Sequence, residues 1–203
     1  MARYGKEHKE ATRRRIIEAA GERLKRDGID GSGVSVLMAD AGLTNGAFYG
    51  HFTSKDDLVA SVVAEQLADQ VTVVNALPAG LESVEAFLRD YLSPTHRDDF
   101  AGGCPSAALL DEIGRCDDTT KQAYTDGARS MIEAITRHLG GDAQVANERA
   151  IGVFTLLVGS LQLARAATDA DLSDRILAAA YTNAMTIAGA PQRSVASIDQ
   201  ESK

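Results

Sequence analysis

The segment from Val34 to Leu58 holds the residues whose types and spacing best fit a chemical task. At its centre is a run of four small, uncharged residues that carries a hydroxyl and an amide. Thr and Asn side chains can hydrogen-bond base edges in the major groove of DNA, where an Ala methyl can also contact the methyl group of thymine. The residues expected to read bases are Thr44, Asn45, Gly46 and Ala47.

Residues just beyond this run fit contact with phosphate. Phe48 and Phe52 are four apart and can face inward together, which leaves Tyr49 and His51 toward the outside. Lys55 falls in the first turn of a predicted helix, where a cation opposes the helix dipole unless an anion such as phosphate docks there. We expect Tyr49, His51 and Lys55 to hold phosphates. The alternatives are half-exposed packing for the first two and a solvated side chain for Lys55.

Two short helices are expected to position these residues. Apolar residues recur at helical spacing from Val34 to Ala41, and Gly42 then breaks the period, as a residue able to adopt a positive φ does after a helix. Thr44 or Asn45 can cap a second helix that ends near His51. Two short helices joined by a tight turn containing glycine form the helix-turn-helix pattern.

The segment from Leu37 to Leu58 resembles the DNA-binding signature of the TetR family of repressors. The resemblance implies a three-helix DNA-binding head on a larger helical body that dimerises and usually binds a small molecule. It also implies that Tyr49 contacts the DNA backbone. Where the family often has Thr before the motif this chain has Gly33, so we expect the phosphate contact there from Ser32 or Ser35. The matching residues are Ala41-Gly42-Leu43-Thr44, Phe48-Tyr49-Gly50-His51-Phe52, Lys55 and Leu58.

The distribution of charge agrees with a DNA-binding head. The 203 residues carry a net charge of −8, but residues 1–60 hold 10 Lys and Arg against 9 Asp and Glu, whereas residues 61–203 hold 11 against 20. Positive charge is therefore concentrated where phosphate would be met. The polar N-terminus and the shortness of the apolar run 150–164 predict a cytoplasmic protein without a membrane partner. Two separate cysteines predict neither a metal site nor a cofactor.

The periodicity predicts an all-α fold of about nine helices. We expect a helix-turn-helix domain over residues 1–56, an effector-binding and dimerisation domain over 57–189 and a disordered tail over 190–203. In more detail, residues 1–8 should be a flexible arm and residues 93–103 a mobile loop. The last two helices are apolar over a wide arc, which predicts a homodimer that pairs them as a four-helix bundle. The alternative is a hairpin buried within one subunit.

Aromatic and sulfur-containing side chains of the body are candidates for the lining of an effector cavity, although such residues at helical spacing are more often plain core. Cys104 precedes a predicted helix, where a thiolate is favoured, but an inert buried thiol is the alternative. The candidate effector-binding residues are Phe87, Tyr91, Phe100, Cys104, Tyr124, Met131 and Phe154.

These observations predict a DNA-binding transcriptional regulator and not an enzyme. We expect a homodimeric, sequence-specific repressor that a small-molecule effector releases from a palindromic operator of double-stranded DNA. The rival hypothesis is a small helical enzyme or a redox or thiol sensor that uses His96, Asp98 and Cys104.

Overall fold

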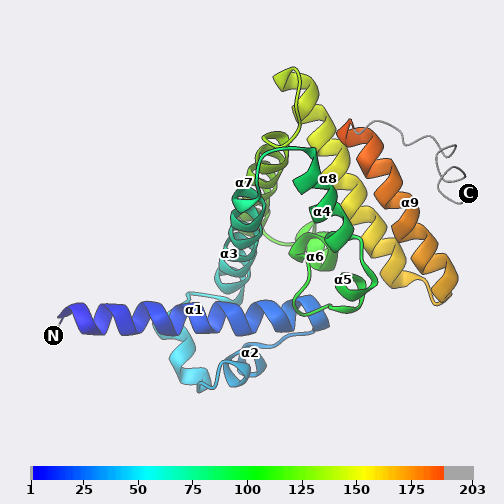
Figure 1. The fold of residues 1–203 in the computed structure, drawn as a ribbon. Helices are drawn as coiled ribbons and strands as arrows, with labels where there is room; N and C mark the ends of the chain where they lie inside the picture. The colour runs from blue at the N-terminus through cyan, green and yellow to red at the C-terminus, as the bar shows by residue number, and fades with distance from the viewer. Residues whose placement is uncertain (1, 190–203) are drawn as a thin grey trace, which may run out of the picture.

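The computed structural model describes the backbone of residues 2–189 and the side chains of residues 6–189, and in this part of the chain every regular element is a helix (Figure 1). The predicted all-α class is confirmed. The tail expected over 190–203 lies outside the described residues. The helices are α1 (Ala2–Asp27), α2 (Val34–Asp40), the 3-10 helix η1 (Asn45–Gly50), α3 (Lys55–Ala76), α4 (Leu81–Tyr91), α5 (Pro94–Asp98), α6 (Pro105–Ile113), α7 (Asp118–Thr136), α8 (Ala143–Ala166) and α9 (Ala170–Ala188).

Helix α1 is longer than the sequence pattern predicted. It is helical from Ala2, so the expected flexible arm over residues 1–8 is wrong for all the residues of it that are described. The arm contains no proline, and Lys6 and Glu10 form an i,i+4 ion pair at 3.8 Å that supports the first turns. The helix ends at Gly28, which has a φ of +82° and donates its N–H to the carbonyl of Leu24 at 2.8 Å.

The head is built from α1, α2, η1 and the start of α3, with α2 and η1 lying below α1 in the view of Figure 1. The apolar stripe of α1 packs against the motif helices in one buried cluster. This cluster also takes in Leu109 and Ile113 of α6, and α3 is continuous across the domain boundary predicted at residue 56. The head is therefore joined to the body by shared core and not by a linker.

The body encloses a second buried cluster between α3, α4, α6, α7, α8 and α9. α8 and α9 lie side by side as an antiparallel pair at the edge of the molecule away from α3 (Figure 1). Leu161 and Ala180 face inward, with at most 3% of either side chain exposed. The described chain contains no helix that is long and apolar enough to cross a membrane.

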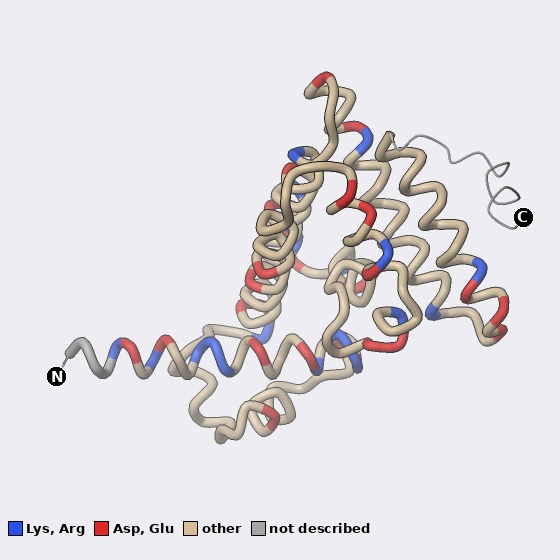
Figure 2. The backbone as a smooth tube through the Cα atoms, in the orientation of Figure 1, with Lys and Arg blue, Asp and Glu red and all other residues tan. Residues whose placement is uncertain are grey.

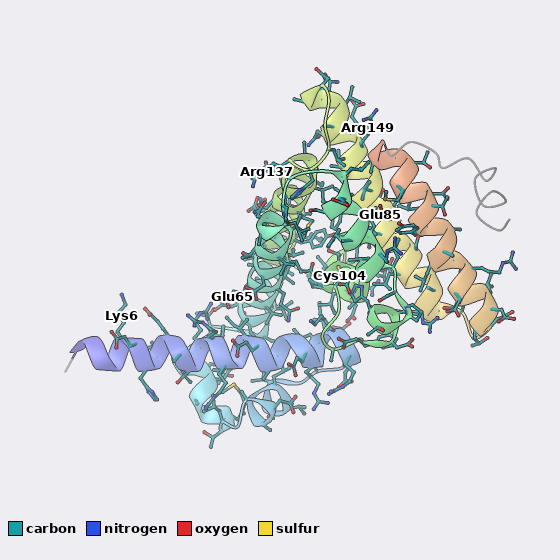
Figure 3. All side chains as sticks on the ribbon, in the orientation of Figure 1. Lys6, Glu65, Glu85, Cys104, Arg137 and Arg149 are labelled. Carbon is teal, nitrogen blue, oxygen red and sulfur yellow. The ribbon has the colours of Figure 1, made fainter. Side chains whose placement is uncertain are left out.

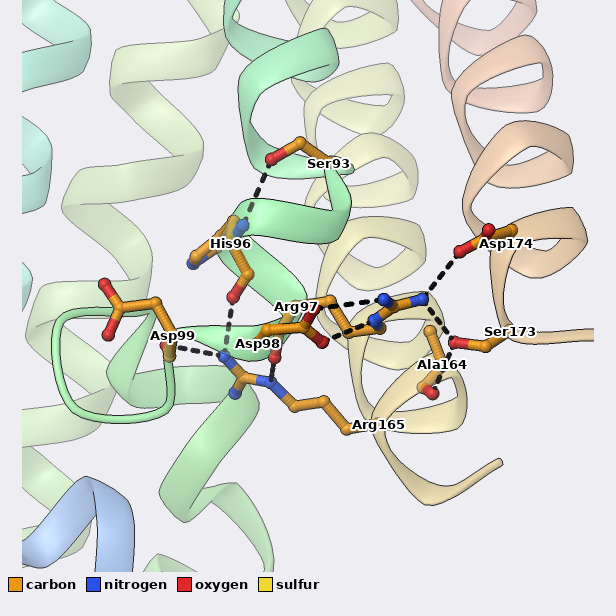
Figure 4. A network of polar contacts seen from close by, with 9 residues as sticks. All are labelled: Ser93, His96, Arg97, Asp98, Asp99, Ala164, Arg165, Ser173 and Asp174. Atoms are coloured by element: carbon orange, nitrogen blue, oxygen red, sulfur yellow. Dashed lines mark hydrogen bonds and ion pairs between the residues drawn. The ribbon is translucent and has the colours of Figure 1, made fainter. Parts of the chain in front are cut away.

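The segment over residues 93–103 was expected to be a mobile loop, but it contains a short helix held by side chains (Figure 4). Ser93 caps α5 by accepting the N–H of His96 at 3.1 Å. At the other end of α5, the Arg165 guanidinium of α8 donates to the carbonyls of Arg97 at 2.9 Å, His96 at 3.0 Å and Asp99 at 3.1 Å. The expectation of an irregular loop is corrected, because a distant arginine satisfies the carbonyls that α5 leaves open.

A second arginine ties the same segment to α9. Arg97 donates to Ser173 Oγ at 3.0 Å and to Asp174 Oδ1 at 2.7 Å (Figure 4). Ser173 in turn donates to the carbonyl of Ala164 at 2.7 Å. The turn that leads into α6 is thus fixed against both α8 and α9.

Candidate DNA-binding site and effector cavity

The tip of the head is exposed and uncharged. Thr44 is the N-cap residue of η1 in an extended conformation, and its hydroxyl makes no capping bond to the helix. Asn45 and Gly46 are exposed, Ala47 is half-buried and Tyr49 is 76% exposed. The candidate base-reading residues therefore stand together on one outer surface, with the Tyr49 side chain beside them.

Two buried aromatic rings hold this tip. Phe48 and Phe52 are 1% and 2% exposed, and their ring centroids are 5.7 Å apart. Tyr49 packs edge-on against Phe48 at 5.3 Å. The Arg13 guanidinium lies over the ring of Phe52 at 4.3 Å and donates to the carbonyl of His51 at 3.0 Å. Because η1 is too short to be stable alone, these contacts and not its own backbone bonds fix its position.

His51 lies at the edge of the tip and is half-buried. Burial lowers the pKa of its imidazole, and the nearby cations Lys9 and Arg13 lower the pKa further. The ring is therefore neutral at neutral pH. Its Nδ1 atom is buried and has no hydrogen-bond partner among the described residues.

The remaining phosphate candidates differ in availability. Ser32 is 1% exposed and its hydroxyl donates to the carbonyl of Gly28 at 2.9 Å, so its predicted role is corrected. The side chain closes the turn after α1 and does not face solvent. Ser35 is exposed in the first turn of α2 and remains a candidate for the phosphate contact. The Lys55 ammonium donates to the carbonyl of Ile29 and is half-buried, so this cation braces the connector between α1 and α2.

Charge around the tip is supplied by the neighbouring helix. In Figure 2 the tube of α2 and η1 is almost wholly uncharged, whereas α1 above it carries Lys and Arg, interspersed with Asp and Glu, along its length. Lys6, Lys9, Arg14 and Arg15 are exposed. Cations flanking an uncharged tip fit a surface that meets phosphates at its margin and bases at its centre.

The body contains a cavity of about 320 Å³ bounded by residues of α3, α4, α7 and α8 and of the segment from α5 to the start of α6. Five of the seven candidate effector-binding residues line it. These are Phe87, Tyr91, Cys104, Met131 and Phe154.

Two candidates lie outside the cavity and are corrected. Phe100 is 44% exposed and stacks under the Arg165 guanidinium at 4.7 Å. Tyr124 packs with the head cluster, and its hydroxyl donates to Ser106 Oγ at 3.4 Å. Residue type and helical spacing made both residues candidates for the cavity lining. They do not reveal the course of the segment that carries Phe100 or the way α7, which carries Tyr124, crosses α3.

Sequence reasoning missed several lining residues. Gln70 and Val73 of α3 were not among the candidates, and the segment 93–103 was expected to be a mobile loop. Ile135, Leu157 and Asp90 carried a usable signal, because they follow Met131, Phe154 and Phe87 by about one helical turn. The lining residues that were missed are Gln70, Val73, Asp90, Ser93, Thr95, His96, Asp99, Gly102, Gly103, Ile135 and Leu157.

The rival hypothesis of a small enzyme or thiol sensor needs His96, Asp98 and Cys104 to lie together, and the structure brings only His96 and Cys104 into contact. His96 and Cys104 meet, but through the backbone: the N–H of Cys104 donates to His96 Nε2 at 3.1 Å, and His96 Nδ1 lies 2.7 Å from the carbonyl of Tyr91. Asp98 is paired with Arg97 at 2.7 Å instead. The Cys104 thiol is fully buried at the start of α6 (Figure 3) and lies 3.7 Å from Gln70 Oε1. The imidazole therefore positions the chain and does not activate the thiol.

Two polar contacts connect the cavity wall to the head. Lys25 of α1 is 9% exposed, and its ammonium donates at 3.1 Å to the carbonyl of Gly103, a lining residue. Burial lowers the pKa of this ammonium. At the far end of α6, Glu112 Oε2 accepts the N–H groups of Ile29 at 2.8 Å and Asp30 at 3.1 Å. α6 thus begins at the cavity and ends on the connector that leads into α2.

Gly28 makes room for the second contact. A Cβ atom at this position would lie 2.7 Å from Glu112 Oε1, and the φ of +82° would strain any L side chain. Among the described residues, no three His, Cys, Asp or Glu side chains are placed to hold a metal ion.

Comparisons with known proteins show which proteins this chain is similar to. Residues 16–62 match the family model of bacterial regulatory proteins of the tetR family. The uncharacterized HTH-type transcriptional regulator Rv0681 of Mycobacterium tuberculosis is 28% identical over 175 residues, which cover 82% of this chain and 78% of that protein. The HTH-type transcriptional repressor SCO4008 of Streptomyces coelicolor is 33% identical over 82 residues, which cover 40% of this chain and 43% of that repressor.

A solved structure extends the likeness to the body. The reduced form of NemR from E. coli superposes with a TM-score of 0.74 at 20% identity, covering 90% of this chain and 100% of that one. Over residues 16–62 the chain therefore carries the DNA-binding domain of the TetR family of bacterial regulatory proteins. The fold of the described residues is also similar to that of a TetR-family transcriptional regulator from Agrobacterium tumefaciens, with a TM-score of 0.68 at 20% identity, covering 86% of this chain and 98% of that one.

Proposed function

We propose that the protein is a sequence-specific repressor that inserts η1 into the major groove of its operator. The observation that carries this proposal is the exposed, uncharged tip from Thr44 to Tyr49, supported from below by Phe48 and Phe52. A rigid tip of small polar side chains can approach base edges closely, and Thr, Asn and Ala side chains can hydrogen-bond or contact those edges.

Each exposed residue has a role in this proposal. Phosphates are held by Ser35, Tyr49, His51 and Lys55, with the hydroxyls and the neutral imidazole acting as hydrogen-bonding groups. Lys55 already donates to Ile29, but an ammonium has three donors and can serve both partners. Bases are read by Thr44, Asn45, Gly46 and Ala47.

We further propose a homodimer formed by the outer surfaces of α8 and α9. Large apolar side chains remain exposed there in the single chain, with Leu163 at 63%, Leu172 at 45% and Ile151 at 43%. Exposed apolar side chains gathered on one helix pair are typical of an interaction surface, and a two-fold axis would make it pair with itself. A two-fold dimer reads a near-palindrome whose half-sites lie about one DNA turn apart.

Two contacts between cavity and head support a proposal that an effector releases the operator. A ligand that fills the cavity displaces the segment around Gly103, and this segment is hydrogen-bonded to Lys25 and continues into α6 with Glu112 at its end. If the displaced arrangement disfavours operator binding, linkage requires that the operator weaken effector binding by the same factor.

Selection of bound duplexes from a random pool tests the proposal. The wild type should enrich a near-palindromic consensus, and Asn45→Ala should relax the preference at one position of each half-site. Asn75→Ala, an exposed change on α3 away from both the tip and the α8–α9 surface, is the matched control and should keep the consensus. The absence of any consensus, or an unchanged one for Asn45→Ala, would contradict the assigned role of η1.

A further inference from the structure

The hydroxyl of Tyr91 is a buried polar group in the cavity wall that the protein itself leaves unused. The residue is 8% exposed and lines the cavity, and its hydroxyl has no hydrogen-bond partner among the described residues. A buried hydroxyl without a partner is costly, which makes it a group that a ligand can satisfy.

The polar groups of two neighbouring residues, Cys104 and His96, are engaged elsewhere. The Cys104 thiol is its neighbour, but a thiol is a weak hydrogen-bonding group, and this one lies toward Gln70 Oε1. His96 uses one ring nitrogen on the carbonyl of Tyr91 and the other on the N–H of Cys104. Burial raises the pKa of Tyr91 well above its ordinary value, so the phenol keeps its proton and can donate it.

The rest of the wall limits the charge of the ligand. Phe87, Met131 and Phe154 supply an apolar surface in which a charged group would lose its hydration. Asp90 and Asp99 are the charged side chains among the described lining residues, and both are exposed. The carboxylates disfavour an anion at the exposed end of the cavity, and the apolar wall disfavours a charge of either sign at the buried end.

We propose that the cavity binds a neutral, mainly apolar carbonyl compound whose oxygen accepts a hydrogen bond from the Tyr91 hydroxyl. A carbonyl oxygen is an acceptor only, so it matches a phenol that retains a free donor. The identity of this compound as the effector rests on the proposed function, but its binding does not require DNA.

Titration calorimetry on the full chain without DNA, using four probes that share a phenylalkyl body, tests the inference. The probes are 4-phenyl-2-butanone, butylbenzene, 3-phenylpropanoate and 3-phenylpropylammonium. We expect the ketone to bind about tenfold more tightly than the hydrocarbon, and both ions to bind more weakly than the ketone. Equal affinity for ketone and hydrocarbon, or tightest binding of either ion, would overturn the proposal.

Two variants assign the preference to one hydroxyl. Tyr91→Phe should bind ketone and hydrocarbon equally, whereas Tyr124→Phe, which removes a hydroxyl outside the cavity, should keep the tenfold preference. A preference that survives in Tyr91→Phe would overturn the assignment. The carbonyl stretching band of the ketone bound to the wild type gives a readout that needs no variant. It should move to lower frequency than in hexane, and an unmoved band would count against the proposal.

Adding the selected operator separates the two proposals. Ketone binding without loss of DNA would support the carbonyl site and contradict release by this ligand. Release of DNA by the carboxylate but not by the ketone would support an effector mechanism and overturn the carbonyl site.

Discussion

Glu112 provides the sharpest test of how the body controls the head. One of its carboxylate oxygens accepts two backbone N–H groups of the connector between α1 and α2 at 2.8 and 3.1 Å. Glu112→Ala leaves both donors without this acceptor. The neighbouring change Asp111→Ala removes an exposed carboxylate whose partner is Arg115, in the turn just after α6, and is the matched control.

The size of the effect follows from the exposure of the two donors. A hydrogen bond to a charged acceptor contributes about 1.5–3 kcal/mol, but the N–H of Asp30 is exposed and can turn to water. Only the bond from Ile29 is partly buried, so we expect the arrangement of the connector to lose about 1.5 kcal/mol. If this whole loss of about 1.5 kcal/mol appears in the free energy of operator binding, the affinity for the operator falls about tenfold.

Fluorescence anisotropy with the selected operator measures this loss, and a thermal unfolding scan checks that the chain stays folded. For a chain of this length the unfolding temperature should fall by only about 3–6 °C. Asp111→Ala should bind like the wild type. Unchanged affinity in Glu112→Ala, or an equal loss in Asp111→Ala, would refute the coupling through α6.

Three further outcomes follow. Phe48→Ala should destabilise the head by about 3–5 kcal/mol in chemical denaturation because it leaves a cavity beneath the tip, whereas Tyr49→Ala should leave stability unchanged and weaken binding to all duplexes. Leu163→Glu should give a soluble monomer in light scattering, whereas Leu161→Glu should unfold the chain because its side chain is fully buried. Burial lowers the pKa of His96, so the unfolded chain takes up a proton below about pH 6.5 that the folded chain does not, and the unfolding temperature should drop more between pH 7 and pH 5 in the wild type than in His96→Asn.

Local patterns predicted the head well. Residue types and spacing between Leu37 and Leu58 are tied to one tight geometry, so they placed Phe48 and Phe52 inside and Thr44 outside. Ser32 escaped this reasoning because its neighbours allow either of two hydroxyls at the surface. The choice is made by one hydrogen bond back to Gly28, which no sequence spacing reveals.

Long-range contacts set the limit for the body. The order around residues 93–103 depends on Arg165, about seventy residues later in the chain, and the segment itself carries no sign of this partner. For the helix pair α8 and α9, the sequence alone did not show which apolar residues face the core and which face outward. The wide apolar arc of this pair predicted an interface, but only the structure separates Leu161, which is internal, from Leu163, which is 63% exposed.

Methylation interference on the selected operator tests most directly whether η1 reads the major groove. Dimethyl sulfate modifies guanine N7, which lies in the major groove, and adenine N3, which lies in the minor groove. The proposed role of η1 predicts that methylated guanines within each half-site block binding by the wild type, and that methylated adenines there do not. Interference confined to adenine N3 would contradict it.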